Sequence, residues 1–334
     1  MKLVLEESFF DFKKIDEPFL YFETEEFESP TITLIMNETE EKLYTPDTVF
    51  REYHIGKNVI TFQKKYGRSS YKVTITGLDE NDIKIYFRWI KKSLKDRLIP
   101  NYLPQLFIVE PLIEFVLLKK GYLLMHSGAA SNPNGAILLA GRSGSYKTPL
   151  LTELINKYNF SFIADDKLII NDEMVYSFPK NLHLFTYLLN KKNNLSEFNQ
   201  ISEKIRCLLS SRNGKCELKI WEKDSVKTVI FLIKSKTNHL KVMRIEKEKA
   251  IEMLIYNTIA EFWVSNHVWG ALMAYSYAHE NFIYPEISLI RQAIKRLLNG
   301  CDTFYSAIIP ADLDEKRMEH LMEEIIQRTD SSSK

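Results

Sequence analysis

The segment from Gly141 to Thr148 (Gly-Arg-Ser-Gly-Ser-Tyr-Lys-Thr) combines residue types that can bind a polyphosphate. Glycines let backbone N–H groups face an anion, and a helix that begins at the loop adds the positive end of its dipole. Lys147 would place a charge on the β- and γ-phosphates, and the Thr148 hydroxyl would bind Mg²⁺. The pattern therefore predicts a site for ATP and Mg²⁺ that comprises Gly141, Arg142, Ser143, Gly144, Ser145, Tyr146, Lys147 and Thr148.

Tyr146 stands where this loop pattern has glycine. If the backbone there needs a positive φ, a tyrosine costs roughly 1–3 kcal/mol. Three outcomes are open: the loop adapts, the ring swings outward over the nucleotide, or nucleotide binding is weakened. The alternative is a glycine-rich turn with an incidental lysine. The flanking strand and helix and the downstream carboxylates favour the phosphate site.

Asp165 and Asp166 end an apolar strand that follows the loop, and His126 heads a strand that precedes it. At a strand terminus both carboxylates can turn towards one site, where one would hold Mg²⁺ and the other would take a proton from an incoming hydroxyl. The alternative is that the pair caps the next turn. His126 is expected beside the loop near the γ-phosphate, with a purely structural histidine as the alternative.

The elements that position these residues are predicted from hydrophobic periodicity and turn residues. Residues 1–100 form a β-rich N-terminal module, with short β-branched runs at 31–36, 58–62 and 71–76 that suggest an antiparallel meander. A basic helix is predicted over Tyr86–Arg97. Beyond it we expect an apolar helix over 107–120, strands over 122–126 and 136–140, a helix after the loop, a strand over 160–164 and a hairpin over 168–178.

The C-terminal part carries the remaining predicted elements. Helical patterns cover 182–209 and 246–278, strands are expected at 229–233 and 306–310, and an amphipathic helix follows over 313–326. A second domain is thus predicted over 106–328. Residues 329–334 are expected to be a disordered tail.

Charge and composition exclude several classes of protein. Among 334 residues, 45 Lys and Arg nearly balance 44 Asp and Glu, so no basic surplus favours nucleic acid. Glutamates interrupt both the first residues and the apolar stretch over 106–118, which argues against a signal peptide and a membrane span. Cys207, Cys216 and Cys301 are scattered, which fits neither a disulfide scaffold nor a zinc site. We therefore expect a cytoplasmic protein with inert thiols.

In its middle section the chain resembles the catalytic domain of the HPr kinase/phosphorylase family, and more closely diverged relatives that phosphorylate a peptide serine. The matching blocks are 126–130, 135–144, Lys147-Thr148 and 163–166, with a weaker one at 177–180. The continuous resemblance covers about residues 121–184 and does not extend to residues 1–100. It implies an α/β fold with a mixed-sheet P-loop kinase domain of the HPr-kinase/carboxykinase type, preceded here by the small β-rich domain.

The resemblance also implies roles for individual residues. Lys147 and Thr148 would bind ATP and Mg²⁺, Asp165 would hold the metal and Asp166 would serve the substrate hydroxyl, although these two roles could be reversed. His126 would lie near the transferred phosphoryl group, so the implied catalytic residues are Asp166, His126 and Lys147. The family uses a further arginine, for which Arg206, Arg212 and Arg244 are candidates.

Three functions follow as hypotheses. The first is an ATP-dependent phosphotransferase that moves the γ-phosphoryl group to a serine-like hydroxyl of a peptide, protein or small metabolite. The second is a degenerate nucleotide-binding module that recruits a partner or regulates it. The third is a carboxykinase-like enzyme that acts on carboxylates. HPr is not the expected substrate, because residues 1–100 do not resemble the family's N-terminal domain. The family often forms homo-oligomers, and segment Trp263–Tyr277 could be core or interface.

Overall fold

The computed structural model describes residues 3–6, 31–36, 46–80, 82–94, 96, 102–179, 218, 220–264, 267–280 and 287–331. These residues form a mixed α/β protein that divides into two compact units. Unit 1 consists mainly of Phe22–Val116 and Phe262–Glu286, and unit 2 of Leu117–Glu261 and Ile287–Lys334. The sequence predicts a boundary between residues 100 and 106. The structure instead divides the chain inside two helices and returns a second segment to unit 1.

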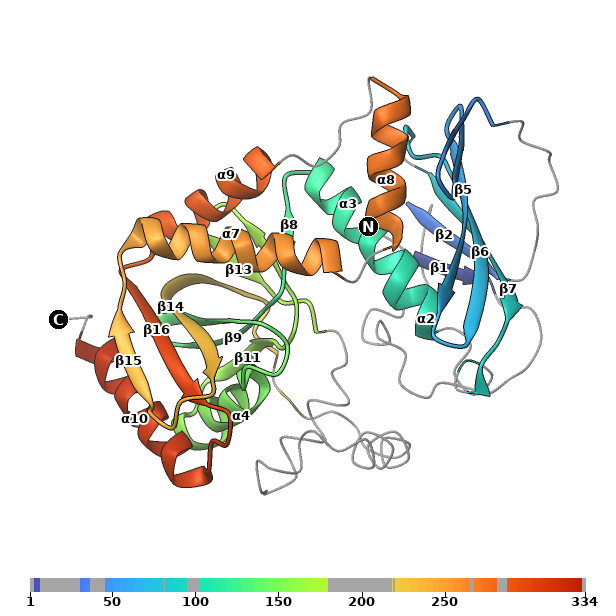
Figure 1. The fold of residues 1–334 in the computed structure, drawn as a ribbon. Coiled ribbons are helices and arrows are strands. Elements are labelled where there is room, and N and C mark those ends of the chain that lie inside the picture. The colour runs from blue at the N-terminus through green and yellow to red at the C-terminus, as the bar shows by residue number, and fades with distance from the viewer. Residues whose placement is uncertain are drawn as a thin grey trace. The chain divides into compact units, whose positions relative to one another are not determined.

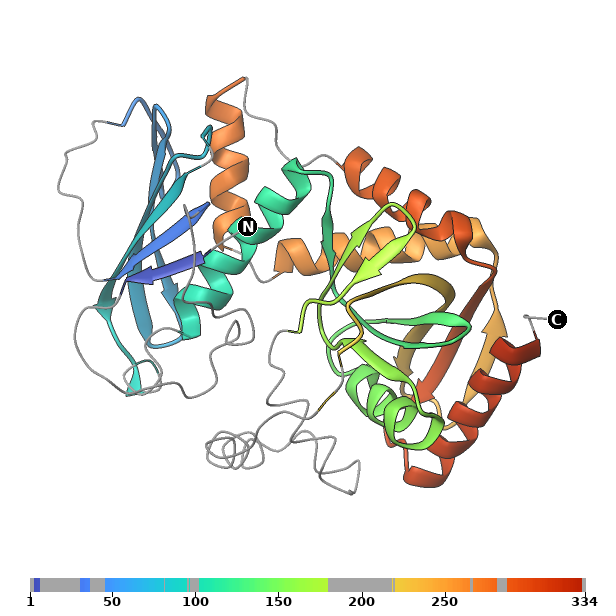
Figure 2. The same ribbon diagram turned by 180° about the vertical axis from the view of Figure 1, so that it is seen from behind.

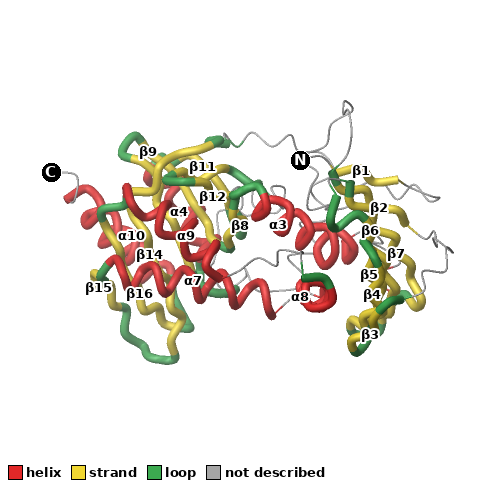
Figure 3. The backbone as a smooth tube through the Cα atoms, turned by 90° about the horizontal axis from the view of Figure 1, so that it is seen from above, coloured by secondary structure: helices red, strands yellow, loops and turns green. Residues whose placement is uncertain are grey.

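Unit 1 is built on a mixed sheet with strand order β1-β2-β7-β6-β5-β4-β3 (Figure 3). Strands β3 to β7 pair antiparallel in sequence order, which confirms the predicted meander for the runs at 58–62 and 71–76. For the run at 31–36 it is wrong, because this run forms β2, which pairs in parallel with β7. Strands β1 and β2 extend this sheet in parallel with β7. The strands are β1 (Leu3–Glu6), β2 (Ile32–Met36), β3 (Thr48–Phe50), β4 (Tyr53–Gly56), β5 (Val59–Tyr66), β6 (Ser69–Thr76) and β7 (Ile83–Lys91).

The basic helix predicted over Tyr86–Arg97 is wrong, because residues 83–91 form strand β7. Its side chains alternate between the core and the solvent, which is the period of a strand. The basic residues Lys84 and Arg88 take exposed positions, and the apolar residues between them are buried. The buried set is Ile83, Ile85, Phe87 and Trp89.

Helices cover one face of the unit 1 sheet. They are α2 (Tyr102–Pro104), the π-helical turn η2 (Gln105–Val109), the unit 1 part of α3 (Glu110–Lys119) and α8 (His267–Ala278). The predicted apolar helix over 107–120 is therefore confirmed, with Gly121 directly after it. Helix α8 contacts this unit through side-chain hydrogen bonds, among them those from Trp269 Nε1 to Glu114 and from the Tyr275 hydroxyl to Asp79.

Unit 2 contains a mixed sheet whose longest strand, β14, joins two arms. The first residues of β14 pair antiparallel with β13, and its later residues pair in parallel with β10 and β16. Strand β9 lies antiparallel between β10 and β11. The strands are β8 (Leu123–Met125), β9 (Ser127–Asn132), β10 (Gly135–Ala140), β11 (Ser161–Ala164), β12 (Leu168–Asn171), β13 (Met174–Tyr176), β14 (Lys223–Ser235), β15 (Lys241–Arg244) and β16 (Thr303–Pro310).

Helices lie on both faces of the unit 2 sheet (Figures 1 and 2). One pair packs on one face and the other pair on the opposite face, where Arg291 of α9 meets Glu252 of α7 at 2.6 Å. The first pair is α4 (Lys147–Tyr158) and α10 (Glu315–Ser331). The second is α7 (Lys247–Val264) and α9 (Ile287–Leu297), the latter followed by the 3₁₀ turn η5 (Leu298–Gly300).

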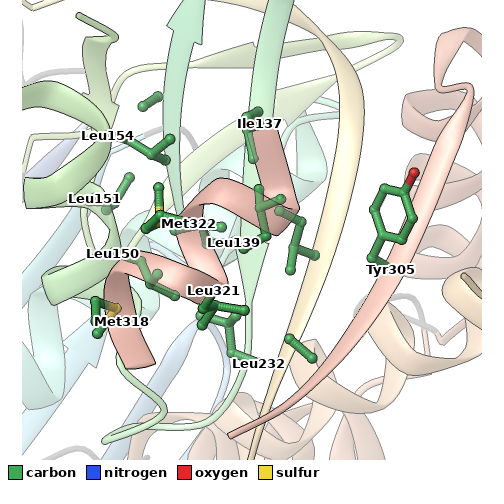
Figure 4. Close-up of a cluster of buried hydrophobic side chains, with 14 of the residues drawn as sticks. Ile137, Leu139, Leu150, Leu151, Leu154, Leu232, Tyr305, Met318, Leu321 and Met322 are labelled. Atoms are coloured by element: carbon green, nitrogen blue, oxygen red, sulfur yellow. The ribbon is translucent and has the colours of Figure 1, made fainter. Parts of the chain in front are cut away.

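The core beneath α4 and α10 fixes the helix that begins at the glycine loop (Figure 4). Leu150, Leu151 and Leu154 of α4 recur at helical spacing and are fully or almost fully buried. They pack in one cluster with side chains of β10, β14, β16 and α10, among them Leu139, Leu232, Tyr305 and Leu321. Burial of this face holds α4 against the strand that leads into the loop.

Most of the other predicted elements of unit 2 are confirmed within a few residues. Helix α10 continues to Ser331, so residues 329–331 are helical and do not belong to the predicted disordered tail. The predicted 182–209 helices, Cys207 and Cys216 lie outside the described residues. Cys301 is a buried free thiol, as expected. In the described part of the chain, no helix is both long and apolar enough to cross a bilayer.

Candidate functional site

The strand topology brings the predicted site residues together at the ends of three neighbouring strands of the unit 2 sheet. Ala140, the last residue of β10, pairs with Ser127 at the start of β9, and Ala164 at the end of β11 pairs with Ala129. The residues that follow β10 and β11 therefore lie beside His126, which directly precedes β9. The loop, the histidine and the aspartate pair are thus assembled from three neighbouring strands.

The glycine loop connects β10 to α4 and needs its first glycine for a steric reason. A Cβ atom on Gly141 would lie 2.7 Å from the backbone oxygen of Leu232 on the adjacent strand β14. Only glycine lets the loop leave the sheet this closely. Arg142, Ser143 and Gly144 are exposed, whereas Ser145 is buried under the loop. The loop thus presents a turn to the solvent above a closely packed base.

Lys147 is the first residue of α4 and is 7% exposed. Its Nζ donates hydrogen bonds to the backbone oxygens of Gly141 at 2.6 Å and Arg142 at 3.2 Å. The same ammonium group lies 3.0 Å from His126 Nε2. These contacts hold the lysine charge inside the curve of the loop. An anion bound there would meet this charge together with the first N–H groups of α4.

His126 links the lysine to Asp166. Because the Lys147 ammonium can only donate, His126 Nε2 accepts, and the ring proton resides on Nδ1. Nδ1 lies 3.1 Å from Asp166 Oδ1. The histidine is buried, whereas the Asp166 side chain is 40% exposed, and Asp166 has a left-handed backbone with φ of 80°. Such strain is common at functional sites, and it aims this carboxylate at both the histidine and the solvent.

Thr148 and Asp165 form a second pair of interacting side chains, next to the contacts from Lys147 through His126 to Asp166. The Thr148 hydroxyl lies 3.0 Å and 2.9 Å from the two carboxylate oxygens of Asp165 and donates to that carboxylate. Burial of Asp165 and the nearby charge of Asp166 raise its pKa to about 6, against the opposing effects of Thr148, Lys147 and His126. A carboxylate that is costly to ionise gains from a cation beside it.

The Thr148–Asp165 pair fits the chemistry of a magnesium site. Mg²⁺ prefers oxygen ligands and is commonly held by one or two carboxylates, a hydroxyl, water and the phosphates of a nucleotide. A hydroxyl and a carboxylate in direct contact supply two such oxygens. Among the described residues, no group of three or more His, Cys, Asp or Glu side chains could hold a metal ion. A cation at Thr148 and Asp165 would therefore need further ligands from water or from the nucleotide.

Tyr146 takes the left-handed conformation that the loop pattern reserves for glycine, with φ of 71° and ψ of 18°. For a tyrosine this costs roughly 1–3 kcal/mol. Its side chain contacts residues outside the loop. The hydroxyl donates to the backbone oxygen of Ala311 at 2.6 Å, and Lys234 Nζ lies 5.3 Å from the ring centroid. The loop therefore keeps the backbone conformation of the glycine pattern, and the tyrosine side chain is anchored on Ala311 and Lys234.

One residue of the site escapes sequence reasoning. Asn257 of α7 donates from Nδ2 to the backbone oxygen of His126 at 3.0 Å. It fixes the turn that carries the histidine. A polar residue on a largely apolar helix was the only available signal. The structure does not bring Arg244 to the loop. Arg244 ends β15, which lies three strands from β10, and it pairs there with Tyr305 of β16. Arg206 and Arg212 lie outside the described residues.

Comparisons with known proteins assign no relative to this site. No protein-family model matches the chain, and no curated protein gives a significant match to it. The function of the site is therefore argued from its own geometry.

Proposed function

We propose that the protein is an ATP-dependent phosphotransferase that moves the γ-phosphoryl group to a serine-like hydroxyl of a peptide, protein or small metabolite. We further propose that unit 2 is a P-loop kinase domain of the HPr-kinase/carboxykinase type. One observation carries the proposal: a buried lysine in a glycine loop is linked through His126 to the exposed carboxylate of Asp166, with the Thr148–Asp165 pair next to it.

The two ends of this arrangement suit the two substrates. The loop and the start of α4 offer N–H donors and the Lys147 charge to a polyphosphate. Asp166 lies on the far side of His126 and is accessible, so an acceptor hydroxyl can approach it. Its carboxylate would accept the hydroxyl proton, and the His126 Nδ1 proton would orient it. Catalysis would then come from positioning and from charge stabilisation.

Thr148 and Asp165 are the residues that would hold Mg²⁺ with the nucleotide. When bound, the ion would supply positive charge that neutralises the phosphates. The chain's own contribution is to orient the ligands: the Thr148 hydroxyl holds the carboxylate of Asp165 before any cation arrives. Asp165 rather than Asp166 is assigned to the metal. Among the hydrogen bonds of the described residues, the Thr148 hydroxyl bonds to the carboxylate of Asp165 and not to that of Asp166.

Nucleotide binding is tested by the thermal shift that Mg·ATP causes in the unaltered protein and in Lys147→Ala. We expect a rise in Tm at saturating nucleotide that the variant loses, because a ligand that binds only the native state stabilises it. Lys157→Ala is the matched control, since Lys157 lies at the opposite end of the same helix and pairs with Glu153 and Glu319. No shift in the unaltered protein, or an equal shift in Lys147→Ala, would contradict the proposal.

A nucleotide-binding module without transfer is the second candidate, favoured by the tyrosine at a glycine position of the loop. It shares the binding result and differs in turnover. Incubation with γ-labelled ATP and a library of serine-containing peptides separates the two. Label transfer that requires Asp166 supports the phosphotransferase, and binding without any transfer or hydrolysis supports the module.

A further inference from the structure

Tyr146 has three contacts that all lie outside the nucleotide loop. Its hydroxyl donates to the Ala311 carbonyl, which belongs to the connection between β16 and α10. The Lys234 ammonium of β14 lies over its ring, and the ring packs against the core cluster beneath α4. The side chain is therefore held near the ends of β14 and β16 and against the core, although the residue itself is part of the loop.

The backbone of Tyr146 is where the loop becomes a helix. Its carbonyl accepts the N–H of Leu150 at 3.1 Å, and its left-handed conformation directs the chain from the Arg142–Ser145 turn into α4. Glycine at this position would be free to leave the conformation. Tyrosine has only two side-chain torsions, so anchoring its hydroxyl restricts its backbone as well.

We propose that Tyr146 is a positioning residue that tethers the phosphate loop to the β16–α10 connection and holds it in its binding conformation before a nucleotide arrives. This inference rests on the proposed function for its role in nucleotide binding. The tether itself is a property of the free protein. A loop that is already ordered loses less entropy when a nucleotide binds. The tyrosine at the glycine position would therefore favour nucleotide binding.

Tyr305 offers a matched control in the same core cluster. Its hydroxyl also donates to a backbone carbonyl, that of Arg328 at 3.4 Å, and a cationic group lies 5.7 Å from its ring centroid. Tyr305→Phe therefore removes the same kind of hydrogen bond as Tyr146→Phe at a position outside the loop. Any general loosening of the core would affect both variants.

The experiment measures amide hydrogen exchange in the full chain without nucleotide. The Ser145 and Leu150 amides report the loop, and the Phe160 amide, bonded to Leu154 at the other end of α4, is the internal reference. Loss of one hydrogen bond is expected to speed exchange at the first two by about fivefold in Tyr146→Phe and to leave the third unchanged. Tyr305→Phe should leave all three unchanged.

Titration with Mg·ADP supplies the second measurement. We expect Tyr146→Phe, which keeps the side-chain ring and the backbone strain, to weaken its Kd by about fivefold, with Tyr305→Phe equal to the unaltered protein. Unchanged exchange or an unchanged Kd in Tyr146→Phe would overturn the tether. Failure of the unaltered protein to bind Mg·ADP would instead overturn the proposed function, while the exchange rates still decide whether Tyr146 orders the loop.

Discussion

Asp166 contacts buried His126 with Oδ1 and leaves part of its carboxylate accessible. This division suggests a direct prediction for Asp166→Asn. The amide keeps an oxygen that accepts the His126 proton, so the loop and nucleotide affinity are expected to persist. It cannot take a proton from a hydroxyl, so transfer should fall by about 10²–10⁴-fold.

Paired measurements of Mg·ATP affinity and phosphoryl transfer check this prediction. Parallel loss of affinity and transfer would mean that Asp166 holds the nucleotide site together. Transfer at the unaltered rate would remove Asp166 from the role of base.

Asp165 gives a prediction about pH. Its pKa is raised to about 6 by burial and by Asp166, from an ordinary value of 3.8. The native state therefore holds this proton more tightly than the unfolded chain. The associated stability is present below about pH 4 and is lost as pH rises through 6.

Asp165→Asn removes the partly buried charge and keeps an acceptor for Thr148. Without added metal we expect its Tm at pH 7 to exceed that of the unaltered protein by about 2–6 °C, with the difference shrinking towards pH 4. Thermal unfolding from pH 4 to 7 measures this. Asp172→Asn, at a side chain 71% exposed, is the control for loss of one negative charge. An equal gain there would contradict the explanation by burial.

At the scale of elements, the turn between β6 and β7 depends on one glycine. Gly77 has φ of 78°, and a Cβ atom there would lie 2.0 Å from the Asp82 carbonyl oxygen. Gly77→Ala is expected to lower the free energy of unfolding by about 3–5 kcal/mol through strain and overlap together. Gly67, in the β5–β6 turn, also has a positive φ but no atom within 4 Å of its Cβ position.

Gly67→Ala should therefore cost only about 1 kcal/mol. Urea unfolding of the two variants provides the comparison. An equal fall in the free energy of unfolding would show that backbone conformation alone decides the cost. The Asp82 carbonyl would then move aside for the new methyl group.

The local elements around the site were predictable because their signals are local. Apolar strands followed by glycines or aspartates mark β10 and β11, and the spacing of Leu150, Leu151 and Leu154 marks α4. Strand β7 is predicted as a helix because its exposed basic residues also suit the polar face of a helix, although its side chains alternate with a period of two. The contacts of Asn257 with His126 and of Tyr146 with Ala311 could not be predicted from the sequence. These residues are 131 and 165 positions apart, and no local pattern encodes such contacts.

At the scale of the whole molecule, neither unit is continuous in sequence. Unit 1 takes most of its residues from 22–116 and then takes α8 from a segment that follows most of unit 2. Helix α8 buries Trp269, Leu272 and Tyr275, and its Gly270 approaches the Tyr53 hydroxyl so closely that a Cβ atom would lie 2.5 Å from it. The N-terminal part of the chain therefore lacks a piece of its own core.

A fragment of residues 1–116 is accordingly expected not to fold by itself. Without α8, Glu114 and Asp79 lose their hydrogen bonds from Trp269 and Tyr275, and the sheet face that contacts α8 becomes exposed. Urea should unfold the fragment without a cooperative transition, and a peptide of residues 262–286 should restore one. The same peptide with Trp269→Ala is the control. Cooperative unfolding of 1–116 alone, unaffected by either peptide, would mean that α8 is dispensable and that the sheet with α2 and the first part of α3 is a complete folding unit.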